Sequence, residues 1–167
     1  MTRSYWERLL DDLGHNGLMD TEITTHSPEE TIDLGQRIGQ QLQGGEVIAI
    51  VGPLGSGKTH LIKGIAVGGG AADRQAVNSP TFVIVNQYEG RFDIYHIDAY
   101  RLDSVAEFEM LGFDDLCYPE SIVLIEWADR VEAAVGDTNP IRIDLRHCDA
   151  QTRTIQIRNQ PAYLHVP

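Results

Sequence analysis

The sequence predicts an α/β fold, because short apolar segments typical of buried strands alternate with segments typical of helices. Residues 46–51 form one such apolar run, and a glycine-rich loop, GPLGSGKT at 52–59, separates it from a segment with helical character. Further strand-like segments are divided by short turns, which indicates antiparallel hairpins. We therefore expect a P-loop NTPase-like three-layer sandwich whose central sheet mixes parallel and antiparallel strands.

Two capping signals mark expected helices. Ser27, Pro28 and Glu30 form a capping box with proline at the first helical position, and apolar residues then recur every four positions over 34–42. Ser104 and Glu107 form a second capping box, which predicts a helix that extends through residue 111 and ends at a glycine. A third helix is expected directly after the glycine-rich loop.

Strands are expected at 46–51, 81–88, 91–98 and 121–127, and in the segments IRIDLRHC and TRTIQIR near the C-terminus. Only Glu89 and Gly90 separate the second strand from the third, so these two are expected to form a hairpin. The last two segments alternate apolar and polar residues and are expected to pair as another hairpin. We expect an N-terminal extension at 1–22, one P-loop domain at 23–160 and a C-terminal tail at 161–167.

Composition limits the possible classes of protein. The chain has 167 residues, enough for one domain with its own core. Its 13 basic and 25 acidic residues give a formal net charge of −12, which argues against direct contact with a nucleic-acid backbone. No apolar run approaches the length of about 20 residues that a membrane span needs, and the N-terminus lacks the apolar core of a secretory signal. Together with Cys117 and Cys148, expected as reduced thiols, these features predict a cytoplasmic protein.

The loop at 52–59 matches GxxxxGK[ST], the pattern of a phosphate-binding loop. Its glycines allow backbone N–H groups to turn toward phosphates, and the following helix directs its positive end at them. In this pattern Lys58 reaches the β- and γ-phosphates and the Thr59 hydroxyl ligates Mg²⁺. The predicted phosphate-binding residues are Gly52, Pro53, Leu54, Gly55, Ser56, Gly57, Lys58, Thr59 and His60.

Hydrolysis also requires an acid that holds Mg²⁺ or orients the attacking water. Glu126 ends the apolar run SIVLIE within the strand at 121–127, and Asp98 ends the strand at 91–98, so both are expected at the sheet edge where ligands bind. Lys58, Asp98 and Glu126 are thus the predicted catalytic residues, and Thr59, Asp98 and Glu126 the predicted metal ligands. A packed or hydrogen-bonded side chain is the commoner role for a histidine such as His96.

The segment NSPTF at 78–82 precedes a predicted strand and is either a nucleotide-sensing switch or a simple connecting loop. Thr81 lies within it and is a candidate contact to the nucleotide. Arg101 follows Asp98 by three residues and pairs either with that acid or with phosphate. The NKxD motif that marks guanine recognition is absent, which favours ATP over GTP as the nucleotide.

The succession GPLGSGKT, SPTF, HIDAYRL, EMLGFDDL and LIEWADR resembles the bacterial TsaE (YjeE-type) family. The resemblance extends from about residue 27 to about residue 158. It implies an ATPase that is required for the threonylcarbamoyladenosine modification of tRNA. It also implies that the protein docks on TsaB-type and TsaD-type partners, that it meets tRNA only indirectly, and that hydrolysis resets the complex between turnovers.

By this resemblance, Thr81 lies in a switch region near the γ-phosphate, and Glu126 takes a Walker-B-like role with Trp127 packed beside it. Asp98 is then a magnesium-shell or catalytic acid. The chain departs from the family pattern at His60, where a second threonine is common, and at 128–129, where Ala-Asp replaces Pro-Glu. The adenine site is poorly marked, and Arg153 is the candidate residue to stack on the base.

Two other functions fit the phosphate loop. A small-molecule or nucleoside kinase would need a lid with several arginines, whereas the arginines between residues 60 and 135 are few and scattered. A nucleotide-dependent scaffold would bind ATP only to order a binding surface. Normal ATP binding with complete loss of turnover in a Glu126→Gln variant would exclude the scaffold.

Overall fold

The structure is a computed structural model that describes residues 19–72, 75–80 and 83–166. Its strands are β1 (Met19–Thr25), β2 (Val47–Val51), β3 (Val85–Glu89), β4 (Asp93–Asp98), β5 (Ser121–Glu126), β6 (Ile141–His147) and β7 (Arg153–Gln160). Its α-helices are α2 (Pro28–Gln41), α3 (Lys58–Gly68), α4 (Val105–Glu109), α5 (Phe113–Leu116) and α6 (Glu132–Val135). Short 3-10 helices are η1 (Ala99–Arg101), η2 (Ala128–Val131) and η3 (Gly136–Thr138).

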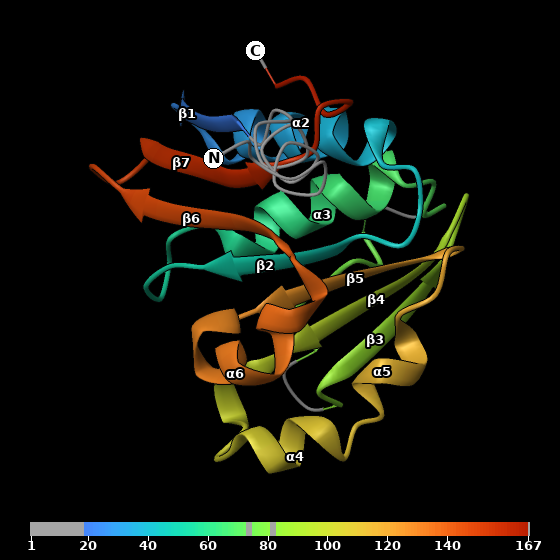
Figure 1. Cartoon of the computed structure of the whole chain (residues 1–167). Coiled ribbons are helices and arrows are strands. Elements are labelled where there is room, and N and C mark those ends of the chain that lie inside the picture. The colour runs from blue at the N-terminus through green and yellow to red at the C-terminus, as the bar shows by residue number, and fades with distance from the viewer. Residues whose placement is uncertain (1–18, 73–74, 81–82, 167) are drawn as a thin grey trace, which may run out of the picture.

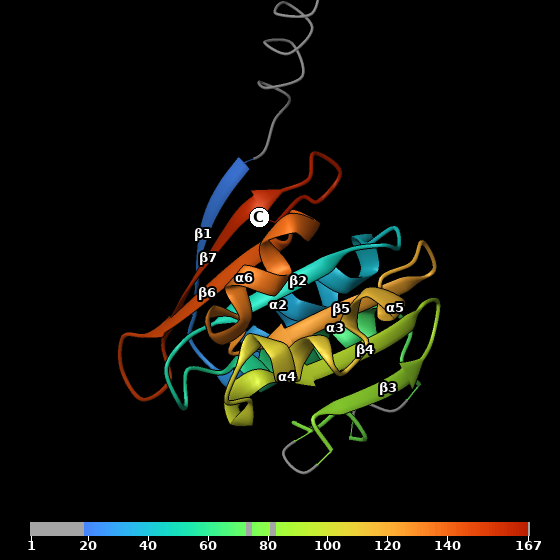
Figure 2. The same ribbon diagram turned by 60° about the horizontal axis from the view of Figure 1, so that its bottom comes forward.

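The strands form one seven-stranded sheet in the order β1-β7-β6-β2-β5-β4-β3. Helices α2 and α3 cover one face, and α4, α5 and α6 lie on the other (Figure 1). The central strands β6, β2, β5 and β4 run parallel, whereas β1, β7 and β3 join the sheet through antiparallel pairs (Figure 2). The α/β class, the three layers and the mixed sheet predicted from the sequence are therefore confirmed.

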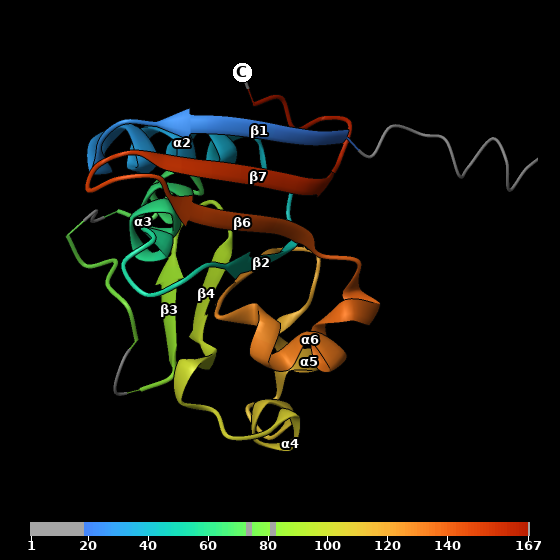
Figure 3. The same ribbon diagram turned by 90° about the vertical axis from the view of Figure 1, so that its left-hand side faces the viewer.

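The parallel pairing places the C-terminal ends of β2, β4 and β5 at one edge of the sheet. Ile50 in β2 is in register with Glu126 in β5, and Glu126 is in register with Asp98 in β4. The phosphate loop leaves β2 at this same edge. The sheet is strongly twisted, so the edge strands β1 and β3 run in different directions (Figure 3).

Apolar side chains form a core on each face of the sheet. Leu34, Ile62 and Leu124 are fully buried between the sheet and the pair α2 and α3. Phe108 and Phe113 pack with ring centroids 4.9 Å apart in the second core, beneath α4 and α5. Ile97 and Ile125, which precede Asp98 and Glu126, are fully buried in the second core, so packing fixes the ends of β4 and β5 at the site.

Helices α2 and α3 pack backbone against backbone at glycines. A Cβ atom on Gly64 would lie 2.0 Å from the carbonyl oxygen of Ile32, and one on Gly39 would lie 2.1 Å from that of Ile65. The same close approach occurs at Gly35 and Gly68. Since each helix carries its glycines four residues apart, they line one face, and this contact fixes α3 and its N-terminal end against α2.

Both predicted capping boxes are confirmed. The Ser27 hydroxyl accepts a hydrogen bond from the Glu30 N–H at 3.1 Å, at the start of α2. The Ser104 hydroxyl accepts one from the Glu107 N–H at 3.2 Å, at the start of α4. The hairpins β3–β4 and β6–β7 are both antiparallel, as predicted.

Other predicted boundaries differ from the structure. The strand expected at 81–88 begins at Val85, because Ile84 has a left-handed backbone with φ 64° that interrupts extended structure. Residues 19–22, assigned from the sequence to the N-terminal extension, belong to β1 and pair with β7. In the segment assigned to the C-terminal tail, Leu164 is buried and the Tyr163 hydroxyl donates to Glu46.

Two further properties concern the chain as a whole. Cys117 and Cys148 are free thiols, as predicted. In the part of the chain that the structure describes, none of the helices combines the length and the apolar character that crossing a membrane requires.

Candidate nucleotide-binding site

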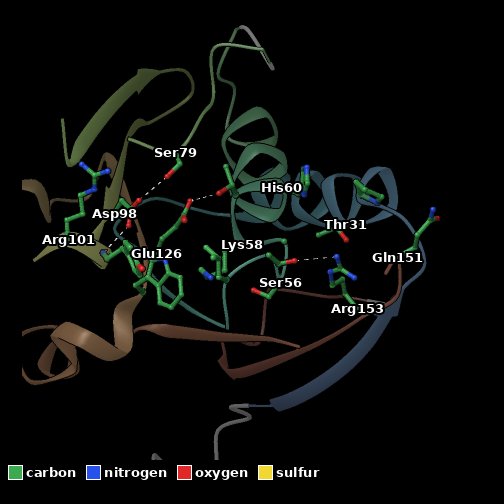
Figure 4. A pocket seen from close by; sticks show the side chains of 17 residues that line it. Thr31, Ser56, Lys58, His60, Ser79, Asp98, Arg101, Glu126, Gln151 and Arg153 are labelled. Carbon is green, nitrogen blue, oxygen red and sulfur yellow. Dashed lines mark hydrogen bonds between the residues drawn. The ribbon is translucent and has the colours of Figure 1, made fainter. Parts of the chain in front are cut away.

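A pocket of about 430 Å³ opens at the sheet edge where the phosphate loop and the two acids meet (Figure 4). It is lined by Pro28, Thr31, Leu54, Gly55, Ser56, Gly57, Lys58, Thr59, His60, Ser79, Asp98, Tyr100, Arg101, Glu126, Trp127, Gln151 and Arg153. The structure thus brings together most of the residues that the sequence singled out. Gly52 and Pro53 are not among the lining residues, but their carbonyl oxygens accept hydrogen bonds from Lys58 Nζ. Thr81 lies outside the described residues.

The phosphate loop depends on glycine at several positions. Gly55 has φ 75° and Gly57, the N-cap of α3, has φ 97°, both in the left-handed region that favours glycine. A Cβ on Gly52 would lie 2.6 Å from the Ser56 Oγ. That Oγ is buried and has no hydrogen-bond partner among the described residues. The loop therefore encloses a polar atom that it does not satisfy itself, as expected of a cradle for a polar ligand.

Lys58 is held at the base of the pocket by three contacts. Its Nζ donates to the carbonyl oxygens of Gly52 at 2.7 Å and Pro53 at 3.0 Å. The same Nζ lies 3.8 Å from the ring centroid of Trp127, a cation–π contact. Burial lowers the pKa of Lys58, and the negative charges of Glu126 and neighbouring acids oppose this effect. The structure thus holds the ammonium group of Lys58 against the phosphate loop.

Thr59 and Glu126 meet at the start of α3. The Thr59 Oγ1 donates to the Glu126 Oε1 at 3.0 Å, and His96 Nε2 lies 2.9 Å from the same oxygen. Glu126 is 3% exposed and His96 is fully buried. His96 in β4 lies opposite Leu124 in β5, and Glu126 follows Leu124 by two residues on the same face. The side chains of His96 and Glu126 therefore point to the α3 side of the sheet, where Thr59 lies in the first turn of the helix.

The carboxylate of Asp98 is engaged at both oxygens. Ser79 Oγ donates to Oδ2 at 2.9 Å, and the Tyr100 N–H donates to Oδ1 at 3.0 Å, which caps η1. Asp98 thereby ties the segment 75–80 to the end of β4. This connection supports a link between the NSPTF segment and the site, whereas the sequence alone left open a simple loop.

Arg153 lies at the opposite end of the phosphate loop from Glu126. Its Nη2 is 3.4 Å from the Gly55 carbonyl oxygen, and its Nη1 donates to the Asp149 carbonyl oxygen at 2.9 Å. Gln151 lines the pocket beside it. The guanidinium is thus held by the turn between β6 and β7 at the end of the pocket farthest from the acids (Figure 4).

Trp127, which the resemblance places beside Glu126, lines the pocket. It has φ 58°, an uncommon left-handed conformation for a bulky residue, and its ring centroid lies 4.8 Å from that of Tyr100. Sequence reasoning did not name Pro28, Thr31, Ser79, Tyr100 and Gln151 as site residues. Of these, Tyr100 carried a signal, because it follows Asp98 at the end of a predicted strand. Among the described residues, no group of three or more His, Cys, Asp or Glu side chains is arranged to hold a metal alone.

A family model described as "Threonylcarbamoyl adenosine biosynthesis protein TsaE" matches residues 25–155. The chain belongs to the TsaE family. The matched residues include the phosphate loop, both acids and Arg153. The resemblance drawn from the motifs is therefore confirmed.

Curated relatives and a solved structure agree with this assignment to the TsaE family. The Treponema pallidum protein named "tRNA threonylcarbamoyladenosine biosynthesis protein TsaE" is 34% identical over 73% of this chain and 88% of its own length. A Mycobacterium leprae protein of the same name is 39% identical over 77% and 85%. The crystal structure of Bacillus subtilis YdiB is similar, with a TM-score of 0.64 and 27% identity over 84% of this chain and 86% of that one.

Proposed function

We propose that this TsaE family member binds ATP with Mg²⁺ and hydrolyses it in the service of tRNA threonylcarbamoyladenosine biosynthesis. The pathway follows from the family and from the printed names of its relatives. The observation that carries the hydrolytic part is the 3.0 Å hydrogen bond from Thr59 of the phosphate loop to Glu126 at the end of β5. It joins a hydroxyl and a carboxylate of the kinds that P-loop NTPases use around Mg²⁺.

The phosphate loop supplies the binding energy in this proposal. The backbone N–H groups around Gly55 and Gly57 and the N-terminal end of α3 attract the phosphates. Lys58 exchanges its two carbonyl contacts for phosphate oxygens, and burial strengthens this attraction because few water molecules screen the charge. Arg153, with its fixed guanidinium, contacts the base.

The residues at the site fit Mg²⁺, which prefers oxygen ligands and retains several water molecules. Thr59 and Glu126 provide a hydroxyl and a carboxylate, and phosphate oxygens and water complete such a site. When bound, Mg²⁺ neutralises charge that develops on the phosphates. A group of three protein ligands is therefore not required, which agrees with the arrangement of the described side chains.

The two acids have different surroundings, which supports different roles. Glu126 shares its Oε1 with Thr59, so we assign it to the metal shell. Asp98 is bonded to Ser79 and to the Tyr100 N–H, and these bonds support our proposal that it couples the NSPTF segment to the bound nucleotide and orients the attacking water. We extend this assignment to Thr81, which follows Ser79 by two residues, as the γ-phosphate contact.

Slow hydrolysis by the isolated protein is expected, because an arginine that stabilises the transition state contributes 10³–10⁵-fold in related reactions. Arg101 and Arg153 are the arginines that line the pocket, and the contacts of Arg153 hold it at the end opposite the acids. We propose that TsaB-type and TsaD-type partners complete the site and that hydrolysis resets their complex. The net charge of −12 suits a protein that meets tRNA only through them.

The test is steady-state ATP hydrolysis by the purified chain, alone and with the TsaB-type and TsaD-type proteins of the same organism. Lys58→Ala serves as the blank. Weak turnover alone that rises with partners supports the proposal. Absence of turnover under both conditions, with ATP bound, supports a nucleotide-dependent scaffold instead. The family assignment gives no support to a small-molecule kinase.

A further inference from the structure

His96 contacts Glu126 from within the core, and the proposed function gives it no role. Its side chain is fully buried, and its Nε2 lies 2.9 Å from the Oε1 of Glu126. The proposed function requires an ionised Glu126, and because an ionised carboxylate only accepts hydrogen bonds, we assign the proton to Nε2. The other ring nitrogen, Nδ1, is buried without a hydrogen-bond partner among the described residues. The imidazole thus has one polar contact in the described structure, and that contact is Glu126.

A purely structural side chain is a poor explanation for this arrangement. Burial of an imidazole with one unsatisfied nitrogen costs stability that an apolar residue would not lose. Ile94, two residues earlier on the same strand and the same face, is a buried and fully apolar side chain. The strand therefore carries a less stable residue at the position that bonds to Glu126.

The buried His96 has a function that offsets this loss of stability when the Glu126 carboxylate must be held in one orientation. Thr59 donates to Glu126 Oε1 from the α3 side, and His96 donates to the same oxygen from β4. Two donors from two different elements fix both the position of the oxygen and the rotation of the carboxylate. Residues that orient a metal-shell ligand in this way commonly affect activity 10–100-fold.

We infer that His96 is a positioning residue, which acts through Glu126 and keeps its carboxylate directed at Thr59 and the pocket. This inference rests on the proposed ATPase function. His96 does not contact the nucleotide or the metal in this assignment, because it does not line the pocket and its Nε2 is directed at Glu126. Its role is to restrict the carboxylate before any ligand arrives.

The test compares two amides at position 96. In His96→Gln the amide nitrogen reaches the position of Nε2 and restores a donor to Glu126. In His96→Asn the amide is shorter and reaches only the position of Nδ1. We expect His96→Asn to lower kcat for ATP hydrolysis about 10–100-fold with less than threefold change in KM, and His96→Gln to stay within about threefold of the wild type.

Two controls separate this role from packing. Ile94→Val removes buried volume from the same face of β4, and we expect kcat within twofold of the wild type. Long-range ¹H–¹⁵N NMR of the ligand-free chain, with the His96→Gln spectrum for assignment, should show a proton on Nε2 of His96 and none on Nδ1. The protonation measurement does not depend on turnover.

Several outcomes would overturn the inference. Equal losses in the Gln and Asn variants, a kcat loss in Ile94→Val as large as in His96→Asn, or a proton on Nδ1 with a bare Nε2 would each do so. If the wild type hydrolyses no ATP, alone or with partners, both the proposed function and the role of His96 are wrong. If the wild type is active and His96→Asn has the same turnover, only the role of His96 is wrong.

Discussion

The Oγ1 of Thr59 donates to the Oε1 of Glu126 across 3.0 Å, although 67 positions separate the two residues in the sequence. The contact exists because β2 and β5 are parallel neighbours, so that the loop after one strand meets the last residue of the other. The sequence marks each residue separately, but it does not show that the two are in contact. Under the proposed function, this pair supplies the hydroxyl and the carboxylate that metal-assisted hydrolysis requires beside a phosphate-binding loop.

Glu126→Gln should abolish turnover while ATP still binds. The amide keeps an oxygen that accepts from Thr59, so the local structure is retained, but it removes the negative charge that supports Mg²⁺. We expect kcat to fall about a thousandfold, within the usual range for loss of an essential acid or base, and the dissociation constant for ATP to change less than fivefold. Hydrolysis assays and calorimetric titration measure the two quantities.

The matched control is Glu120→Gln, at an exposed glutamate just before β5. It makes the same chemical change on the same segment and should leave kcat within twofold. A Glu126→Gln variant that keeps more than a tenth of wild-type turnover would contradict the assignment of Glu126 to the metal shell.

Lys58→Ala should abolish hydrolysis at small cost to folding. Loss of one charge-stabilising donor typically lowers kcat 10²–10³-fold. The variant leaves the Gly52 and Pro53 carbonyls without Nζ, but it also removes a buried amine whose pKa burial already lowers. We therefore expect the free energy of unfolding to change by about 1 kcal/mol or less, measured by urea denaturation.

Lys63→Ala, on the same helix but outside the pocket, is its control and should retain turnover. Comparable loss in both variants would mean that Lys58 acts through general charge and not through the loop. A Lys58→Ala protein that fails to fold would show that the lysine belongs to the core.

The sequence predicted the parts of the fold whose signals are local. Capping boxes, apolar runs and the phosphate loop are each contained within a few residues, and the structure confirms the helices and strands they mark. Strand β1 was missed because MDTEITT has only two apolar residues, Met19 and Ile23, and its extended structure depends on pairing with β7. Strand preference depends strongly on such neighbours.

The same distinction holds in the site. The phosphate loop and both acids were found because each stands at a recognisable position after an apolar strand. The bonds from Ser79 to Asp98 and from His96 to Glu126 depend on strand register, which one sequence does not reveal. The left-handed backbone of Trp127, with φ 58°, carries no local sequence signal either.

Arg153→Ala should raise the KM for ATP about two- to fivefold and leave kcat within twofold. A guanidinium over an aromatic face contributes about 0.5–1 kcal/mol at exposed sites, and Arg153 lies far from the acids. Steady-state kinetics measures both constants. Arg146→Ala, exposed on β6 and outside the pocket, should change neither. An unchanged KM in Arg153→Ala would argue against a base contact by Arg153.

Gly64→Ala should destabilise the fold by about 3 kcal/mol, in the upper range for an overpacked core. The added Cβ would lie 2.0 Å from the Ile32 carbonyl oxygen, and backbone on both helices leaves no flexible atom to move away. Gly136→Ala is the control: its φ is −56° and nothing lies within 4 Å, so we expect no loss and a gain of about 0.5 kcal/mol. Urea denaturation measures both. Equal stability of the two variants would mean that α2 and α3 separate without cost, and the contact would then not fix the N-terminal end of α3.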